Sequence, residues 1–301
     1  MQRKLIIGTR GSPLALYQAN LVKTLLGHES RIKIFKTSGD RITGDLKDFG
    51  GKGLFTKELE AALINGDIDL AVHSMKDVPT ISQEGLSIEA VLKREDPRDA
   101  FISYKVSRLM DLPHKAVVGT ASIRRRAQLS AIRPDIQFSL LRGNVGTRID
   151  KLKNGDCDAT FLAVAGLNRL GEQGLITEAI EANIMLSAPA QGAIGIEIRK
   201  SDTKTKKIIA SLNHYETEIS VAAERSFLRA LDGSCKTPIA ALANYKDKTL
   251  NFRGEVISKD GTLVFSREVK QKILSIDEAI SLGYKLGIDL RKEIGKKILW
   301  D

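Results

Sequence analysis

Arginines cluster in one part of the chain in a pattern suited to binding anions. Residues 117–150 contain six arginines and only two acidic residues. A run of arginines by itself is typical of a solvated helix face. Here, however, Arg124, Arg142 and Arg148 come from separate segments, each just after a predicted strand. Because arginine presents a planar fork of donors that suits carboxylate or phosphate, this spacing favours an anion-binding site.

Polar side chains follow the other predicted strands as well. Arg10 and Ser12 come after the first strand, Lys76 and Asp77 after a buried one, and Arg169 after the last strand of the second region. In open α/β sheets, ligands bind beyond the carboxyl ends of the strands. On the residues alone, Asp77 is either part of a structural ion pair or the carboxylate that stabilises a transient cation or moves a proton.

The two cysteines have different surroundings. A lone cysteine is most often a small buried core residue. Cys235 stands in a polar, glycine-containing turn beside Lys236, which favours a reactive thiolate. Cys157 stands between two aspartates that oppose a thiolate, and we assign it to structure. Two cysteines exclude a disulfide framework, and no Cys or His pattern predicts a metal site.

The elements that must position these residues alternate between strand and helix. In residues 1–95, strands are predicted at Lys4–Gly8, Ile32–Thr37 and Ile68–Ser74, with helices at Pro13–Leu26 and Thr56–Asn65. Ser12 is placed to cap the first helix, because a hydroxyl residue followed by proline is a typical helix start. The glycine- and charge-rich segment 39–53 is predicted to be a mobile loop.

Residues 99–187 repeat this alternation, and the tail differs. Strands are predicted at Ala116–Gly119, Ile136–Leu141 and Ala159–Val164, and helices begin near Ser122 and Val145. Both regions therefore predict a mostly parallel sheet covered by helices. The tail predicts a helix at Ile219–Leu231, antiparallel strands at Pro238–Tyr245, Thr249–Ser258 and Thr262–Val269, and a final helix opened by a capping box at Ser275 and Glu278.

Composition bounds the class of protein. The chain has 301 residues, 42% of them hydrophobic and 28% charged, and a formal net charge of +10. This is the composition of a globular protein of two or three domains, and the positive charge favours anionic partners. No apolar run reaches the length of a membrane span, and no signal peptide is recognisable. We therefore expect a cytoplasmic protein.

Other anion-binding classes fit less well. The segment Gly50–Gly53 lacks the spacing of a phosphate-binding loop. Aromatic residues make up only 5% of the chain and are not interleaved with the arginines, which disfavours nucleic-acid binding. A non-catalytic two-lobed binder of an anionic small molecule stays open as the alternative function.

Several ordered motifs carry a resemblance to one family over essentially the whole chain. They are Thr9-Arg10-Gly11-Ser12-Pro13-Leu14-Ala15-Leu16, Gly50-Gly51-Lys52-Gly53-Leu54-Phe55, His73-Ser74-Met75-Lys76-Asp77-Val78-Pro79, Arg94-Glu95-Asp96-Pro97-Arg98-Asp99-Ala100, Leu141-Arg142-Gly143-Asn144-Val145-Gly146-Thr147-Arg148 and the Gly233-Ser234-Cys235 turn. With these motifs the chain resembles the hydroxymethylbilane synthase family, also called porphobilinogen deaminases.

The resemblance implies an α/β fold with two lobes like those of type II periplasmic binding proteins, plus a small α+β C-terminal domain. Lobe 1 would comprise residues 1–95 and about 192–214, lobe 2 residues 96–191, and the cofactor-attachment domain residues 215–301. It also implies a transferase that joins four porphobilinogen molecules head to tail, with release of ammonia, into hydroxymethylbilane. A dipyrromethane cofactor, held by a thioether to Cys235, would prime the reaction.

The resemblance assigns roles to matched positions. Asp77 would be catalytic, facing the pyrrole N–H groups and stabilising the azafulvenium-like cation that forms as ammonia leaves. The residues implied to bind cofactor, substrate or growing chain, or to line the site, are Arg10, Ser12, Lys52, Ser74, Lys76, Thr120, Ser122, Arg124, Arg125, Arg142, Gly143, Arg148, Arg169 and Gln191.

As partners we expect porphobilinogen but neither nucleic acid nor a membrane. We expect a monomer that makes at most a transient contact with the next enzyme of the pathway. Four positions depart from the family pattern: Ser187 where proline is common, Ala190 and Ser234 where glycine is common, and Asp48 where a basic residue occurs. The segment 187–192 should be the return crossing between the lobes, so its flexibility is expected to differ.

Overall fold

The computed structural model describes residues 4–41, 53–231 and 237–298. The chain divides into two compact units. Unit 1 comprises residues 1–95 and 193–218, and unit 2 comprises residues 96–192 and 219–301. The three-part domain division expected from the resemblance stays a prediction, and each unit is described below by itself.

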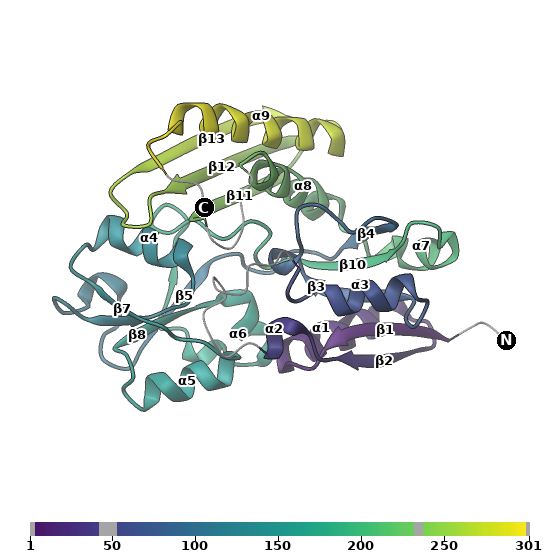
Figure 1. Ribbon diagram of the computed structural model, residues 1–301, viewed down its shortest axis with the longest axis horizontal. Coiled ribbons are helices and arrows are strands. Elements are labelled where there is room, and N and C mark those ends of the chain that lie inside the picture. The colour runs from purple at the N-terminus through teal and green to yellow at the C-terminus, as the bar shows by residue number, and fades with distance from the viewer. Residues whose placement is uncertain (1–3, 42–52, 232–236, 299–301) are drawn as a thin grey trace. The chain divides into compact units, whose positions relative to one another are not determined.

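Unit 1 is built around a five-stranded sheet with the order β2-β1-β3-β10-β4 (Figure 1). Strands β1 and β2 pair in parallel, as do β1 and β3, whereas β10 runs antiparallel to both β3 and β4. In chain order the elements are β1 (Leu5–Arg10), α1 (Pro13–Leu26), β2 (Ser30–Phe35), α2 (Ser38–Arg41), α3 (Lys57–Ile64), β3 (Leu70–Ser74), the 3-10 helix η2 (Met75–Asp77), β4 (Leu86–Val91), β10 (Ile194–Arg199), α7 (Thr203–Ile209) and the 3-10 helix η5 (Ala210–Leu212).

Local signals explain how the first helix is positioned. The Ser12 side chain caps α1 by accepting a hydrogen bond from the Ala15 backbone N–H, and Pro13 occupies the first turn. Gly27 ends the helix in the left-handed conformation, which glycine adopts without a Cβ penalty. The predicted start and end of this helix are confirmed. Its buried face, with Ala19 and Val22, packs on strand residues such as Ile7 and Val72.

The first part of unit 2 holds a second five-stranded sheet, with the order β7-β6-β8-β5-β9. Its elements are β5 (Asp99–Ser103), the 3-10 helix η3 (Leu109–Asp111), β6 (Val117–Gly119), α4 (Ile123–Ile132), β7 (Gln137–Ser139), α5 (Val145–Lys153), β8 (Ala159–Ala163), α6 (Val164–Leu170), the 3-10 helix η4 (Gln173–Leu175) and β9 (Glu178–Ile180). Two separate apolar clusters share its strands. Phe101 and Phe161 belong to one, and Ile102 and Leu162 belong to the other.

Each five-stranded sheet is mixed, so the expectation of mostly parallel sheets is wrong for half of the pairings. In unit 2, β6 runs parallel to β7 and β8, but β5 runs antiparallel to β8 and β9. The alternating segments that the sequence reveals supply the parallel strands. The antiparallel strands, β5 here and β10 in unit 1, come from segments that carry no helix–strand alternation of their own, so the pattern did not disclose them.

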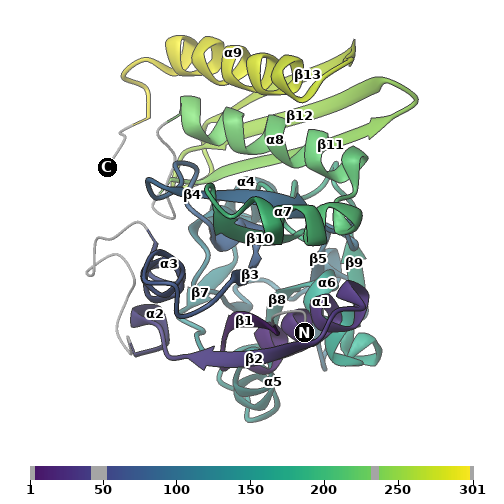
Figure 2. The same cartoon turned by 90° about the vertical axis from the view of Figure 1, so that its right-hand side faces the viewer.

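The C-terminal part of unit 2 is a three-stranded antiparallel sheet with two helices, which confirms the predicted α+β tail (Figure 2). The elements are α8 (Tyr215–Ala230), β11 (Ile239–Lys246), β12 (Thr249–Ile257), β13 (Val264–Lys272) and α9 (Ile276–Ile294). Its core contains Phe227 from α8 and Phe252 from β12, with ring centroids 5.3 Å apart. At Gly283 the two helices approach so closely that a Cβ would lie 2.2 Å from the Ala223 carbonyl oxygen.

Among the described helices, none is long and apolar enough to cross a bilayer.

The segment that leads to the end of the 96–192 stretch holds one residue in a strained conformation. Ala190 is buried and has a φ of 61°, in the left-handed region that favours glycine. Its backbone N–H donates to Glu224 Oε2 at 2.6 Å, and Glu224 Oε1 accepts from the Ala243 N–H at 2.7 Å. A buried carboxylate therefore holds the strained residue against the C-terminal part of unit 2.

This strain predicts that Ala190→Gly stabilises the protein. Glycine removes the left-handed penalty, which exceeds the extra chain entropy it introduces, so we expect the free energy of unfolding to rise by up to about 1 kcal/mol. Ala188→Gly is the matched control, two residues away and without a positive φ. It should lower stability by about 0.5–1 kcal/mol. Urea denaturation of both variants measures whether each substitution raises or lowers the free energy of unfolding. An equal loss of stability in both variants would contradict the prediction.

Candidate functional site

Asp77 stands at the end of the buried strand β3, on the 3-10 turn η2. Met75 anchors this turn, because its side chain is only 2% exposed. Lys76 is exposed and Asp77 is half-buried. Within the described part of the chain, no hydrogen bond or ion pair engages the Asp77 carboxylate. The carboxylate is therefore able to interact with a ligand, as the catalytic reading requires.

Two hydroxyl residues predicted for the site lie on well-supported positions of unit 1. Ser74 Oγ accepts a hydrogen bond from Gln18 Nε2 at 2.9 Å, and Gln18 is a buried residue of α1. Ser12 caps the same helix. Helix α1 and the end of β3 are thus connected through the Gln18 side chain, which the sequence did not indicate.

Arg10, at the end of β1, already has a partner. Its guanidinium forms an ion pair with Asp40, donating through Nε at 3.3 Å and also through Nη2. It also lies 4.3 Å from the centroid of the Phe55 ring. Burial raises the pKa of Asp40, but hydrogen bonds from Arg10 and Thr37 outweigh it and leave that pKa lowered. The ion pair with Asp40 and the contact with the Phe55 ring fix the orientation of the Arg10 guanidinium.

In unit 2, three of the predicted residues converge on a single carboxylate, that of Asp99. Asp99 is the first residue of β5 and is fully buried. Arg124 Nη1 lies 2.8 Å from Oδ2, Arg125 Nη2 lies 2.7 Å from Oδ1, and Gln191 Nε2 donates to Oδ1 at 2.9 Å. Both arginines are buried as well, each with 6% of its surface exposed.

The charges in this cluster control one another. Burial alone would raise the pKa of Asp99, but attraction to Arg124 and Arg125 outweighs burial and holds that pKa far below its usual range. Burial lowers the pKa of Arg124, and repulsion from Arg125 adds to this while Asp99 opposes it. Asp99 therefore stays ionised at neutral pH and stabilises the charge of both arginines.

Arg142 and Gly143 form the approach to α5. Arg142 Nη1 is buried and has no acceptor among the described residues, which is costly unless a ligand supplies one. Gly143 has a φ of 118°, and a Cβ there would lie 2.8 Å from that of Thr147, so only glycine fits. Arg148 Nε donates to the Gly143 carbonyl at 2.8 Å, and Asn144 caps the helix.

The remaining predicted residues of unit 2 are also ordered by local contacts. Ser122 caps α4, and Thr120 Oγ1 accepts a hydrogen bond from the Ser122 N–H at 3.1 Å. Arg169, on α6, is 9% exposed and donates through Nη2 to the Gly192 carbonyl at 2.6 Å. Lys52 and Cys235 lie outside the described residues.

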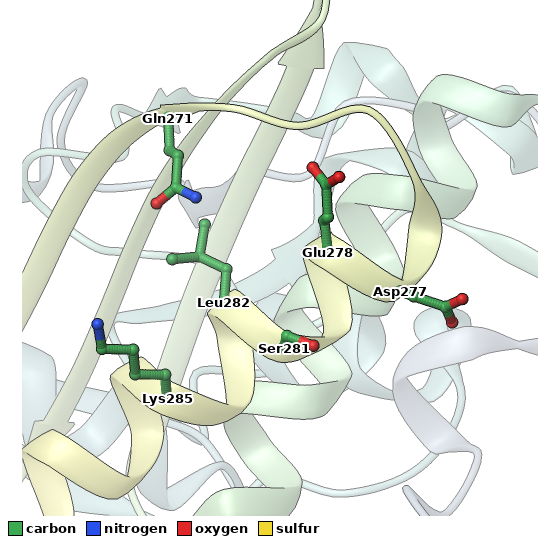
Figure 3. Close-up of a pocket in the computed structure, with 6 residues that line it drawn as sticks. All are labelled: Gln271, Asp277, Glu278, Ser281, Leu282 and Lys285. Atoms are coloured by element: carbon green, nitrogen blue, oxygen red, sulfur yellow. The ribbon is translucent and has the colours of Figure 1, made fainter.

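A shallow hollow on the C-terminal part of unit 2 is unrelated to these residues. It is lined by Gln271 of β13 and by Asp277, Glu278, Ser281, Leu282 and Lys285 of α9 (Figure 3). The Glu278 carboxylate already accepts from the Leu274 N–H at 2.9 Å as part of the helix cap. None of the predicted site residues lines this hollow.

The sequence interpretation missed Asp99 as a functional candidate. It appeared only as part of a motif, without a role. The available signal was an acidic residue directly before the apolar run Ala100–Ile102, which places a carboxylate at the start of a buried strand. A buried charge needs a partner, so this position called for a cation.

Asp99 predicts a specific pH dependence of stability. Asp99→Asn should lower the free energy of unfolding by about 3–5 kcal/mol at pH 7, because it leaves two buried cations without their counter-ion. Since the folded-state pKa of Asp99 is lowered, its contribution is present above the unfolded pKa of about 3.9 and is lost as pH falls further. The difference in free energy of unfolding between the wild type and Asp99→Asn should therefore become smaller below about pH 4.

Urea unfolding between pH 3 and 7 measures this difference. Asp135→Asn is the control, because Asp135 also has a lowered pKa, due first to its hydrogen bond from Arg133, but both side chains of that pair keep some contact with solvent. The loss in free energy of unfolding caused by Asp135→Asn should be much smaller. A difference between wild type and Asp99→Asn that stays constant over this pH range would contradict the prediction.

Two family models match most of the chain. The model described as "Porphobilinogen deaminase, dipyromethane cofactor binding domain" matches residues 5–207. The model "Porphobilinogen deaminase, C-terminal domain" matches residues 219–292. The first match spans every predicted site residue except Cys235, and it also spans Asp99.

Curated relatives and solved structures were also compared. The chain is 47% identical over 298 residues to a porphobilinogen deaminase of Paracoccus denitrificans, which covers 96% of this chain and 94% of that protein. It is 48% identical over 299 residues to one of Nitrobacter hamburgensis, covering 97% and 94%. A putative methionine-binding lipoprotein from Bacillus subtilis matches with a TM-score of 0.43 and 15% identity, covering 72% of this chain and 93% of that one. By its family models and its relatives, the chain belongs to the porphobilinogen deaminase family.

Proposed function

We propose that this chain is a hydroxymethylbilane synthase. It joins four porphobilinogen molecules head to tail and releases ammonia, giving the linear tetrapyrrole hydroxymethylbilane. The observation that carries the proposal is the match to the cofactor-binding family model over residues 5–207, since this stretch contains the accessible Asp77 carboxylate together with the arginines of unit 2. The family consists of transferases of tetrapyrrole synthesis.

The residues present fit a dipyrromethane cofactor. The buried Nη1 of Arg142 lacks an acceptor among the described residues, and a carboxylate of the cofactor would supply one. Arg148 and the N-terminus of α5 follow directly along the chain and are further groups that suit an anion. When bound through a thioether to Cys235, the cofactor supplies a covalently held primer of two pyrrole rings to which substrate units are added.

The arginines of this chain would bind acetate and propionate groups. A carboxylate–cation pair at 4 Å is worth about 1 kcal/mol in water and about 4 kcal/mol at an effective dielectric constant of 20. Buried side chains such as Arg124 and Arg169 lie in such surroundings. Several forks of this kind would hold a growing chain whose negative charge increases with each unit, with Arg10, Lys52, Lys76 and the hydroxyls of Ser12, Ser74, Thr120 and Ser122 as further contacts.

Asp77 would act on the substrate itself. Loss of ammonia from porphobilinogen leaves positive charge on its pyrrole ring system, and a carboxylate aimed at that charge lowers the barrier. The free Asp77 carboxylate can also accept the pyrrole N–H and take part in moving the proton that is lost from the attacked carbon. Gly143 and Gln191 would line the site without taking part in the chemistry.

The proposal extends to location and assembly. A biosynthetic enzyme whose reactive cysteine must stay reduced suits the cytoplasm. We propose that it works as a monomer and meets the next enzyme of the pathway only transiently, because its product is released as a free linear tetrapyrrole.

Intact-mass spectrometry tests the proposed function. The purified wild type should carry an added mass equal to two pyrrole units, and Cys235→Ser should lack it, because the serine hydroxyl does not form the thioether. Cys157→Ser is the matched control and should keep the added mass, since burial raises the pKa of the Cys157 thiol and keeps it protonated. A wild type that stays unmodified after incubation with porphobilinogen would contradict the assignment.

Asp77→Asn tests the catalytic role. The amide cannot balance the developing positive charge, so we expect kcat to fall by roughly 10²-fold or more while KM changes little. Asp67→Asn is the control, because Asp67 is an exposed acid of unit 1 whose only described ion pair is with Lys33. Single-turnover release of ammonia measures the chemical step, and near-normal release by Asp77→Asn would refute the role.

A further inference from the structure

Asp99 connects residues that the proposed function uses, although it has no role assigned. Its carboxylate is 0% exposed, so no substrate group can reach it in this structure. It contacts Arg124 and Arg125 of α4 and Gln191 of the segment that closes the 96–192 stretch. Three side chains from two distant segments therefore meet at one buried carboxylate.

The charges of this cluster do not cancel. Two guanidinium groups share one carboxylate, which leaves an excess positive charge in a buried place. Glu255 of β12 also attracts Arg124, but it is itself paired with Arg253, with Nη2 and Oε1 2.5 Å apart, so the net charge stays positive. A buried uncompensated charge is costly, so an anionic ligand group that approached the arginines would complete the cluster.

The two arginines differ in the donors that they keep free. Arg125 uses Nε and Nη2 on Asp99 and donates through Nη1 to the Phe161 carbonyl at 2.8 Å. Every hydrogen bond that Arg124 donates within the described residues comes from Nη1, to Gln128 Oε1 and to the Leu186 carbonyl. Arg124 thus keeps the Nε and Nη2 edge of its guanidinium for another acceptor, and Arg125 does not.

Packing fixes the backbone of α4 independently of Asp99. The turn between β12 and β13 lies against this helix, where a Cβ on Gly261 would be 2.5 Å from the Ala131 nitrogen. Gln128 Nε2 also donates to the Leu186 carbonyl at 3.1 Å. The helix would therefore keep its place without Asp99, whereas Nε and Nη2 of Arg125 would lose their acceptor and Arg124 its ion pair.

We propose that Asp99 is a positioning residue: it locks the Arg125 guanidinium and the Gln191 amide and orients Arg124, so that the free edge of Arg124 binds a carboxylate of the substrate or growing chain. This inference rests on the proposed function. It assigns different roles to the two neighbouring arginines: Arg124 binds the ligand, and Arg125 belongs to the buried ion-pair cluster behind it.

Steady-state kinetics of Asp99→Asn and Asp99→Glu test the proposal. The first removes the charge, and the second keeps the charge but moves the carboxylate by one methylene, so it remains informative if the first fails to fold. Loss of one charge-assisted contact predicts a rise in KM for porphobilinogen of about tenfold or more in both variants. Because Asp77 is untouched, kcat should change by less than about threefold.

Asp69→Asn is the matched control for a purely structural role. Asp69 is a buried acid of unit 1, accepts a hydrogen bond from the Ile6 N–H and lies 3.6 Å from Arg199, outside the proposed site. The Asp69→Asn substitution should lower the melting temperature as the Asp99 variants do, yet leave KM for porphobilinogen unchanged. If both Asp99 variants kept KM within about twofold of this control at equal loss of stability, the proposal would be overturned.

A second readout is independent of turnover. In the wild type, the Nε proton of Arg125 should exchange slowly with water, because it is buried and donates to Asp99 Oδ1 at 3.2 Å. In Asp99→Asn it should exchange at least about tenfold faster; Arg125→Lys identifies the NMR signal. Unchanged exchange would refute the positioning role, whereas absence of hydroxymethylbilane with the wild type would refute the proposed function instead.

Discussion

The buried carboxylate of Asp99 is the constraint on which the arginine-rich part of unit 2 depends. Two guanidinium groups on successive residues of one helix repel each other, and burial makes that repulsion stronger. They are compatible with a folded core only because β5 begins with an acidic residue between them. The sheet, the helix and the binding groups are therefore not separate features, because the first residue of the strand makes the arginines of the helix tolerable.

Burial gives the two aspartates at strand ends opposite properties. Asp99 is enclosed, ion-paired with two cations and unavailable to substrate. Asp77 follows an equally buried strand, but the short turn anchored by Met75 lifts it to a half-exposed position, without a partner in the described residues. One carboxylate stabilises cations that belong to the protein, and the other is the one that we propose stabilises a cation formed only during the reaction.

Local signals made much of the fold predictable, whereas long-range pairing did not. The caps at Ser12 and Ser275 and the start of α5 follow from neighbouring residues, and the structure has them as predicted. The antiparallel strands β5 and β10 and the ion pairs of Asp99 join residues far apart in sequence. The arginine run indicated an anion site, but spacing alone could not show that Arg125 is already occupied by a protein carboxylate.

The end of the 96–192 stretch shows why some site residues must serve two purposes. Arg169 holds the Gly192 carbonyl, Gln191 holds Asp99, and Glu224 holds the N–H of the strained Ala190. Each of these polar groups belongs to unit 2, and the first stretch of that unit ends at Gly192. A change at Arg169 or Gln191 therefore alters the path of the backbone as well as any contact with a ligand. Because Asp99 contacts Gln191 as well as Arg124 and Arg125, it links the course of this segment to the arginines of α4.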